Sequence, residues 1–105
     1  MKVNIYMVKE MVYNYDNGNL LFEGEYLYGK RNGKGKEYND NGKLRFEGDY
    51  FNDKKWNGKG KEYFNGKLIF DGEYLNGNRH GKGKEYDDNG NLIYEGEYFL
   101  GYRIK

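Results

Sequence analysis

One sequence motif occurs four times in the chain, and this repetition constrains the fold more than any other feature. Four pentapeptides of the form aromatic-x-Gly-x-Tyr have their central glycines 24 residues apart, at Gly24, Gly48, Gly72 and Gly96. In the first three copies a second motif follows, written Gly81-Lys82-Gly83-Lys84-Glu85-Tyr86 in the most regular one. A fixed period of roughly 20–50 residues is typical of proteins in which similar units stack along one axis.

Each repeat contains two segments that predict β-strands. In the first segment Phe22, Gly24 and Tyr26 alternate with Glu23 and Glu25, so aromatic and charged residues fall on opposite faces. Tyrosine, with 13 residues, favours strands, and alanine is absent. The first strands are expected at 20–27, 44–51, 68–75 and 92–99, and the second strands at 33–38, 58–63 and 81–86. The sequence therefore predicts an all-β fold.

Turn residues and charges predict how these strands pair. The pairs Asn17-Gly18, Asn41-Gly42, Asn65-Gly66 and Asn89-Gly90 are typical of tight turns between repeats. Longer loops are then expected inside the repeats, at 28–32, 52–57 and 76–80. In the favoured register Glu23 faces Lys36, Gly24 faces Gly35 and Tyr26 faces Gly33. Opposite charges then meet on one face, while aromatic rings cover glycines on the other.

The first 14 residues lie outside the repeat pattern. Their alternation favours a capping strand, with a short helix as the alternative. The segment 9–18 takes the place that 36–42 takes one repeat later. The repeat array itself is expected to divide at 15–37, 38–62, 63–85 and an incomplete 86–105.

Composition excludes several classes of function. Cysteine, serine and threonine are absent and His80 is the only histidine, so neither a hydroxyl or thiol nucleophile other than tyrosine nor a thiolate metal site is available. The net charge is +1, and basic residues are interleaved with acidic ones, which argues against a nucleic-acid partner. We therefore expect a non-enzymatic, cytoplasmic protein without cofactor or metal.

The repeats resemble MORN (membrane occupation and recognition nexus) repeats. Residues 22–42, 46–66 and 70–90 match that pattern, and residues 94–101 match its first half; in the first copy the matching positions are Phe22, Gly24, Tyr26, Gly29, Gly33, Gly35 and Gly42. The resemblance implies an elongated, curved, single-layer antiparallel sheet of β-hairpins with open edges. It also implies a scaffold that binds protein segments, dimerises or lies near membranes, and phosphoinositide binding has been proposed for such repeats.

The first candidate site is the aromatic stripe, which we expect either to form the core alone or to bind a partner. A single sheet has no second layer to cover this face. Part of the stripe is therefore expected to stay accessible and to bind a peptide or helix of a partner protein. The stripe consists of Phe22, Tyr26, Phe46, Tyr50, Phe70, Tyr74, Tyr94 and Tyr98.

The second candidate site is the edge of the sheet that carries the expected long loops. Its basic residues suit anionic phospholipids or an acidic partner, which would place the protein at a membrane or the cytoskeleton. The edge comprises Lys30, Arg31, Lys54, Lys55, Trp56, Arg79, His80 and Arg103. The lysines and acids of the charged face are instead expected to form a solvated lattice of ion pairs.

The strand expected at 92–99 is a candidate for self-association. No further Gly-Lys-Gly segment follows it, so one of its edges is expected to lack a partner. Such edges recruit other strands. The sequence leaves open whether this is a whole protein or part of a longer array.

Overall fold

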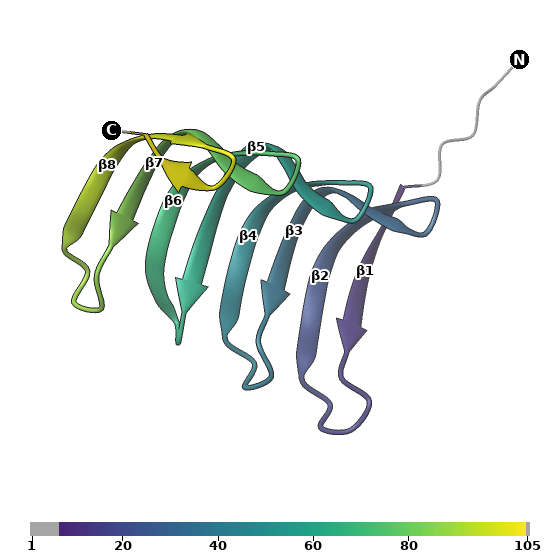
Figure 1. Cartoon of the computed structure of the whole chain (residues 1–105). Helices are drawn as coiled ribbons and strands as arrows, with labels where there is room; N and C mark the ends of the chain where they lie inside the picture. Colours follow the sequence, from purple (N-terminus) through teal and green to yellow (C-terminus); the bar gives the residue numbers. More distant parts are fainter. Residues whose placement is uncertain (1–6, 105) are drawn as a thin grey trace, which may run out of the picture.

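The protein is a single antiparallel β-sheet in which every strand pairs with its neighbours in sequence. The structure, a computed structural model, describes residues 7–104. Nine strands follow one another across the sheet in the order β1 to β9 (Figure 1). They are β1 (Met7–Tyr13), β2 (Leu20–Leu27), β3 (Lys30–Tyr38), β4 (Leu44–Phe51), β5 (Lys54–Phe64), β6 (Lys67–Leu75), β7 (Asn78–Tyr86), β8 (Leu92–Phe99) and β9 (Tyr102–Arg103). The predicted all-β sheet of repeated hairpins is confirmed.

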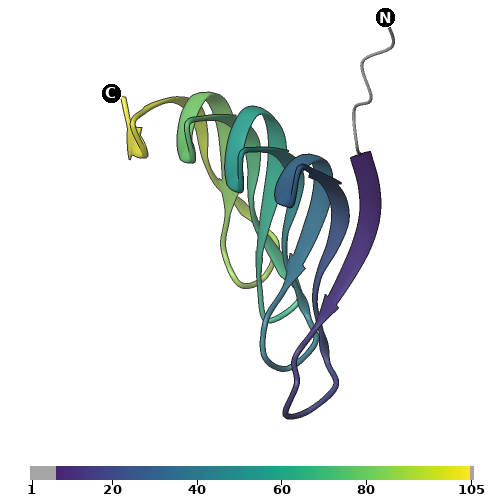
Figure 2. The same ribbon diagram turned by 90° about the vertical axis from the view of Figure 1, so that its right-hand side faces the viewer.

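The sheet is elongated, and its hairpins are strongly bent. Its principal extents are 50 × 39 × 15 Å. Viewed from the side, each hairpin curls over at one end, and the curled ends lie in a row (Figure 2). The described residues contain no helix long and apolar enough to span a bilayer.

The prediction of long loops inside the repeats is wrong. Those connections are two-residue turns at the curled ends, for example Tyr28-Gly29 and Asn76-Gly77, and both residues of each have positive φ. This is the geometry that tight β-hairpin turns require. The Asn-Gly pairs instead lie in loops of five or six residues at the other edge, except Asn65-Gly66, which is a two-residue turn.

A bulge in the second strand of each repeat explains why the turns are short: it takes up residues that were assigned to the loops. Glu23 pairs with Lys36 and Gly24 with Gly35, as predicted, but Tyr26 pairs with Arg31 rather than with Gly33. Gly33 adopts a φ of 96°, and the residues around it are extra to the pairing with β2, although Gly33 and Lys34 pair with β4. They belong to a continuous strand that bends, not to a loop, because the chain on both sides still pairs with β2.

The core is a row of aromatic rings on one face of the sheet. Phe22, Phe46 and Phe70 are at most 1% exposed. Each packs edge-to-face against the tyrosine of its own pentapeptide and the tyrosine of the next one, with ring centroids 5.2–5.7 Å apart. Their ring tips lie over paired glycines, such as Gly24 and Gly35, where an added Cβ would come within 2.8 Å of the ring. Glycine is therefore required under each ring.

Strand β1 differs from the other strands of its kind. It places Glu10 opposite Gly24, whereas β3 has Gly35 opposite Gly48. Lys9 faces Glu25, so it takes the register position of Lys34, not the position of Lys36 that the sequence comparison indicated. Glu10 therefore carries a side chain at a register position where β3 has a glycine. Residues 1–6 of the predicted capping segment lie outside the described residues.

Candidate functional site

The aromatic stripe does not form an accessible surface. Besides the three phenylalanines, Tyr50, Tyr74 and Tyr98 are only 2–5% exposed, and Tyr26 and Tyr94 are partly buried. The prediction that part of this stripe stays open to a partner is therefore wrong for six of its eight rings. The bend of each hairpin brings polar side chains over the rings, so the face is covered without a second layer.

Arginine and glutamate side chains form this cover. The guanidinium of Arg31 lies 4.0 Å from the centroid of the Phe22 ring and 3.2 Å from the Glu37 carboxylate. Glu37 also accepts a hydrogen bond of 2.6 Å from the Tyr50 hydroxyl. Cation–π contact and ion pairing thus hold Arg31 against the stripe. Burial and the hydrogen bond to Glu37 both raise the pKa of Tyr50, so this hydroxyl stays protonated.

The same arrangement recurs in later repeats. Arg79 stacks 4.2 Å from the Phe70 centroid and pairs with Glu62 at 2.7 Å, and Glu62 also accepts a hydrogen bond from Tyr74. At the C-terminal end Glu85 accepts hydrogen bonds from Arg103 and from Tyr98. The hydrogen bond from Arg103, ahead of that from Tyr98, lowers the pKa of Glu85 to about 2. These polar groups therefore stabilise the fold.

Among the described side chains, the predicted basic edge has fewer basic residues outside ion pairs than the sequence suggested. Arg31, Arg79 and Arg103 are the ion-paired residues just described. The His80 ring lies 5.3 Å from the ring of Phe99. Lys30 and Lys54 are exposed beside the tight turns, whereas the side chains of Lys55 and Trp56 lie outside what the structure describes.

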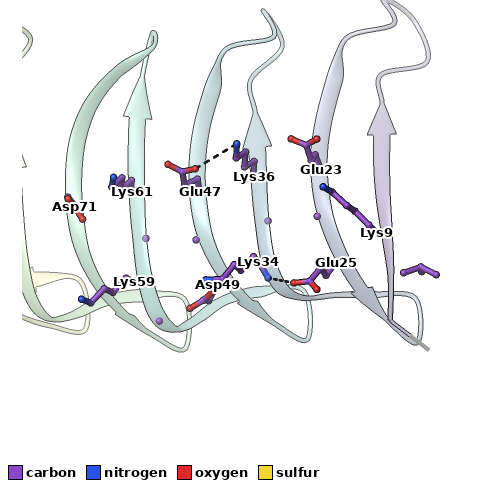
Figure 3. A pocket seen from close by; sticks show the side chains of 16 residues that line it. Lys9, Glu23, Glu25, Lys34, Lys36, Glu47, Asp49, Lys59, Lys61 and Asp71 are labelled. Carbon is purple, nitrogen blue, oxygen red and sulfur yellow. Dashed lines mark hydrogen bonds and ion pairs between the residues drawn. The ribbon is translucent and has the colours of Figure 1, made fainter. Parts of the chain in front are cut away.

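An open groove lies over the opposite, charged face. A hollow of about 1210 Å³ crosses strands β1 to β6, and its floor is formed by glycines such as Gly24, Gly35 and Gly48. A second hollow of about 590 Å³ continues it to β8 and shares Lys59 and Asp71 with it. Figure 3 shows the charged side chains that line the first hollow. They are Lys9, Glu23, Glu25, Lys34, Lys36, Glu47, Asp49, Lys59, Lys61 and Asp71.

Charge in this groove is ordered in stripes. Strand β3 contributes only lysines, Lys34 and Lys36, and strand β4 contributes only acids, Glu47 and Asp49. The same alternation continues through β5, β6, β7 and β8. Pairs across the stripes are long and solvated: Lys34–Asp49 is 3.6 Å and Lys36–Glu47 is 4.0 Å. The predicted lattice of ion pairs is present, and it lines a groove that the sequence did not predict.

Some groove carboxylates also hold the backbone. The Lys34 amide in the bulge donates a 3.0 Å hydrogen bond to the Glu25 carboxylate, and the Lys82 amide donates one of 2.7 Å to Glu73. On the same two strands, the Tyr38 hydroxyl donates a hydrogen bond of 3.2 Å to the Glu23 carboxylate. Burial, followed by the Glu23 charge, raises the pKa of Tyr38. These acids are therefore fixed in position.

The charges of the groove are interleaved across the strands. Within residues 7–104 no group of three or more His, Asp or Glu is placed to hold a metal ion. The acidic stripes of β4 and β6 each lie between two lysine stripes. The signal for the groove was present in the sequence: strands β2 to β8 each carry two charges of one sign that flank a glycine. Its depth depends on the bend of the hairpins, which the sequence did not reveal.

Comparison with protein families identifies the repeats. The MORN repeat model matches residues 70–92, and the MORN repeat variant model matches residues 7–28 and 31–52. No curated protein and no solved structure matches the chain significantly. The family matches together cover more than half of the chain, and one begins at β1, ahead of the first motif seen in the sequence. MORN repeats are in general modules for interaction with proteins or membranes. The chain belongs to the MORN repeat family.

Proposed function

We propose that this protein is a non-enzymatic scaffold that binds a segment of a partner protein in the groove of its charged face. The groove carries the proposal, because it is a large open hollow that crosses most of the sheet. This replaces the aromatic stripe as the contact surface, since the stripe is buried.

The groove has properties that suit protein recognition. Its floor of glycine backbone leaves room close to the sheet, and its walls carry both lysines and acids. Fixed charges of both signs favour a partner with a complementary order of charges over one that is merely acidic or basic. Hydrogen bonds hold the carboxylates of Glu23, Glu25 and Glu73, so these acids need little ordering on binding.

The experiment is capture of partners from a lysate of the source cells on the immobilised full chain. A second column carries the groove variant Lys34→Glu with Lys59→Glu. A third carries Lys43→Glu with Lys67→Glu, a matched charge change at exposed lysines outside the groove. We expect a protein that is retained by the first and third columns and lost from the second. Equal retention on all three columns would contradict binding in the groove, provided that circular dichroism shows that the variants are folded.

Membrane docking is the second candidate, supported by the composition of the curled edge. Tyr28, Leu100 and Tyr102 are 52–78% exposed there, near the exposed Lys30 and Lys54. Aromatic residues beside lysines suit the interface of an anionic bilayer. Sedimentation with phosphatidylserine vesicles tests this candidate. Binding that is lost in Lys30→Glu with Lys54→Glu would support it, and no binding at low salt would exclude it.

A further inference from the structure

We propose that the partner segment is an α-helix whose successive turns carry charges of alternating sign. This inference rests on the proposed function and specifies the occupant of the groove. It follows from the spacing and the order of the charges along the groove floor.

The charged stripes repeat at the spacing of the strands. The groove crosses the strands, so neighbouring stripes are separated by the strand distance of about 4.8 Å. Lysine stripes lie on β3, β5 and β7, and acidic stripes on β2, β4, β6 and β8. A segment that lies along the groove therefore meets a change of sign about every 4.8 Å.

Among regular backbones the α-helix matches this spacing best. A helix presents side chains on one face once per turn, about every 5.4 Å. An extended strand presents them about every 6.8 Å, and a polyproline II helix about every 9.3 Å. Charges at positions i, i+4 and i+7 of a helix, alternating in sign, would each lie near a stripe of opposite sign.

The groove is long enough for several helical turns. Eight strands span about 34 Å, which corresponds to about 22 helical residues. An apolar rim is available on the same face beside the tight turns. Phe51 and Phe99 are 47% and 54% exposed there, and Leu27 and Leu75 occupy the equivalent positions. The rim offers apolar contact to the helix, whereas the stripes set its register, since exposed charges contribute more to selectivity than to affinity.

Two synthetic peptides of identical composition test the inference. The alternating peptide is (EAAAKAA)₃, which places glutamate and lysine in turn along one helical face. The block peptide has three glutamates followed by three lysines at the same six positions. Binding is measured by calorimetry, and the contact surface by amide chemical shifts of the labelled full chain. Circular dichroism is used to compare the helicity of the two peptides.

We expect the alternating peptide to bind at least about 10-fold more tightly than the block peptide, because each misplaced charge meets a like stripe. The shifts should concentrate on the lining residues of the groove, and Lys34→Gln with Lys59→Gln should weaken binding at least about 10-fold. The Lys43→Gln with Lys67→Gln variant should bind like the wild type.

Equal affinity for the two peptides, or shifts confined to the tight turns, would overturn the helix inference. If neither peptide binds but a lysate protein is still lost from the groove-variant column, the proposed function stands and the helix inference fails. If neither peptide binds and no lysate protein depends on the groove, both proposals fail.

Discussion

Single polar residues account for the burial of the aromatic face. In most proteins a second layer of structure covers the apolar side of a sheet. Here Arg31 and Arg79 lie across the rings of Phe22 and Phe70, and glutamates neutralise their charge. An arginine is well suited to this position because its planar guanidinium stacks on a ring and pairs with a carboxylate at the same time.

At the residue scale, Glu85→Gln is expected to change how stability depends on pH. The pKa of Glu85 is lowered from its ordinary value of 4.5 to about 2, chiefly by the hydrogen bond from Arg103. A depressed carboxyl pKa contributes stability above about pH 4.5, and this contribution is lost as the pH falls toward 2. Urea unfolding at several pH values should therefore show a smaller acid loss in Glu85→Gln, together with lower stability at pH 7.

The matched control for this prediction is Glu95→Gln. Glu95 is exposed on the charged face and pairs with Lys84 at 3.7 Å. Its removal should change both the stability at pH 7 and the acid loss little, since exposed pairs contribute little. An acid loss in Glu85→Gln equal to that of the wild type would show that the interactions of Glu85 do not stabilise the folded state.

At the scale of the strand, each hairpin bends at the bulge in its second strand. In β3 this bulge lies around Gly33. The Glu25 carboxylate lies where a Gly33 side chain would be, with Oε1 2.7 Å from the position of an added Cβ. It also accepts the Lys34 amide. A glycine and a carboxylate from the neighbouring strand together make the bulge possible.

The variant Glu25→Ala tests the role of this carboxylate. Without it the Lys34 amide loses its acceptor, which should destabilise the protein by roughly 0.5–1.5 kcal/mol. Hydrogen exchange at the Lys34 amide should become faster. The Lys82 amide, which donates to Glu73 in the third repeat, should keep its exchange rate and serves as an internal control. Equal acceleration at both amides would indicate a global loss of stability rather than a local effect.

The strands could be predicted from the sequence because local and cross-strand signals agree. Alternation placed Phe22 and Glu23 on opposite faces, and one register matched opposite charges, so β2 and β4 begin and end where expected. The second strands were predicted too short because Gly33 and Gly81 were interpreted as their first residues, with loops immediately before them. In the structure their positive φ values, 96° and 94°, lie inside continuous strands.

The candidate sites could be predicted only in part. The sequence identified which residues share a face, but not how exposed each face is. Exposure of Tyr50 and Tyr74 depends on the bend that brings arginines and glutamates over the rings. The Asp53 carboxylate accepts a 2.7 Å hydrogen bond from the Arg31 amide and so links neighbouring turns. Such contacts between repeats depend on three-dimensional geometry that one repeat does not encode.

At the scale of the whole molecule, the sheet is a one-dimensional stack of contacts. Phe46 touches the rings of Tyr50 and Tyr74, which belong to its own repeat and the next one. In such an array stability is close to a sum of units and of neighbouring interfaces. A defect at the centre should therefore separate the two halves.

The substitution Phe46→Ala is expected to lower the free energy of unfolding by about 3–5 kcal/mol, the usual effect of removing a buried phenylalanine side chain. Its hydrogen exchange should increase most in β4 and β5. The control is Phe64→Ala, because Phe64 is 63% exposed and its removal should cost less than about 1 kcal/mol. A similar loss in both variants would show that the ring row does not determine stability.

Because lysine and acidic strands alternate, the groove can be lengthened or shortened in units of one repeat. Each added or deleted repeat changes the groove by two strands, or about 9.6 Å, and always by one lysine stripe and one acidic stripe. Gain or loss of a repeat would thus alter the length of the groove while leaving the alternation of charge sign unchanged. Under the proposed function, the length of the bound segment and its charge pattern could therefore be changed independently, by adding or removing repeats or by substituting the charged residues.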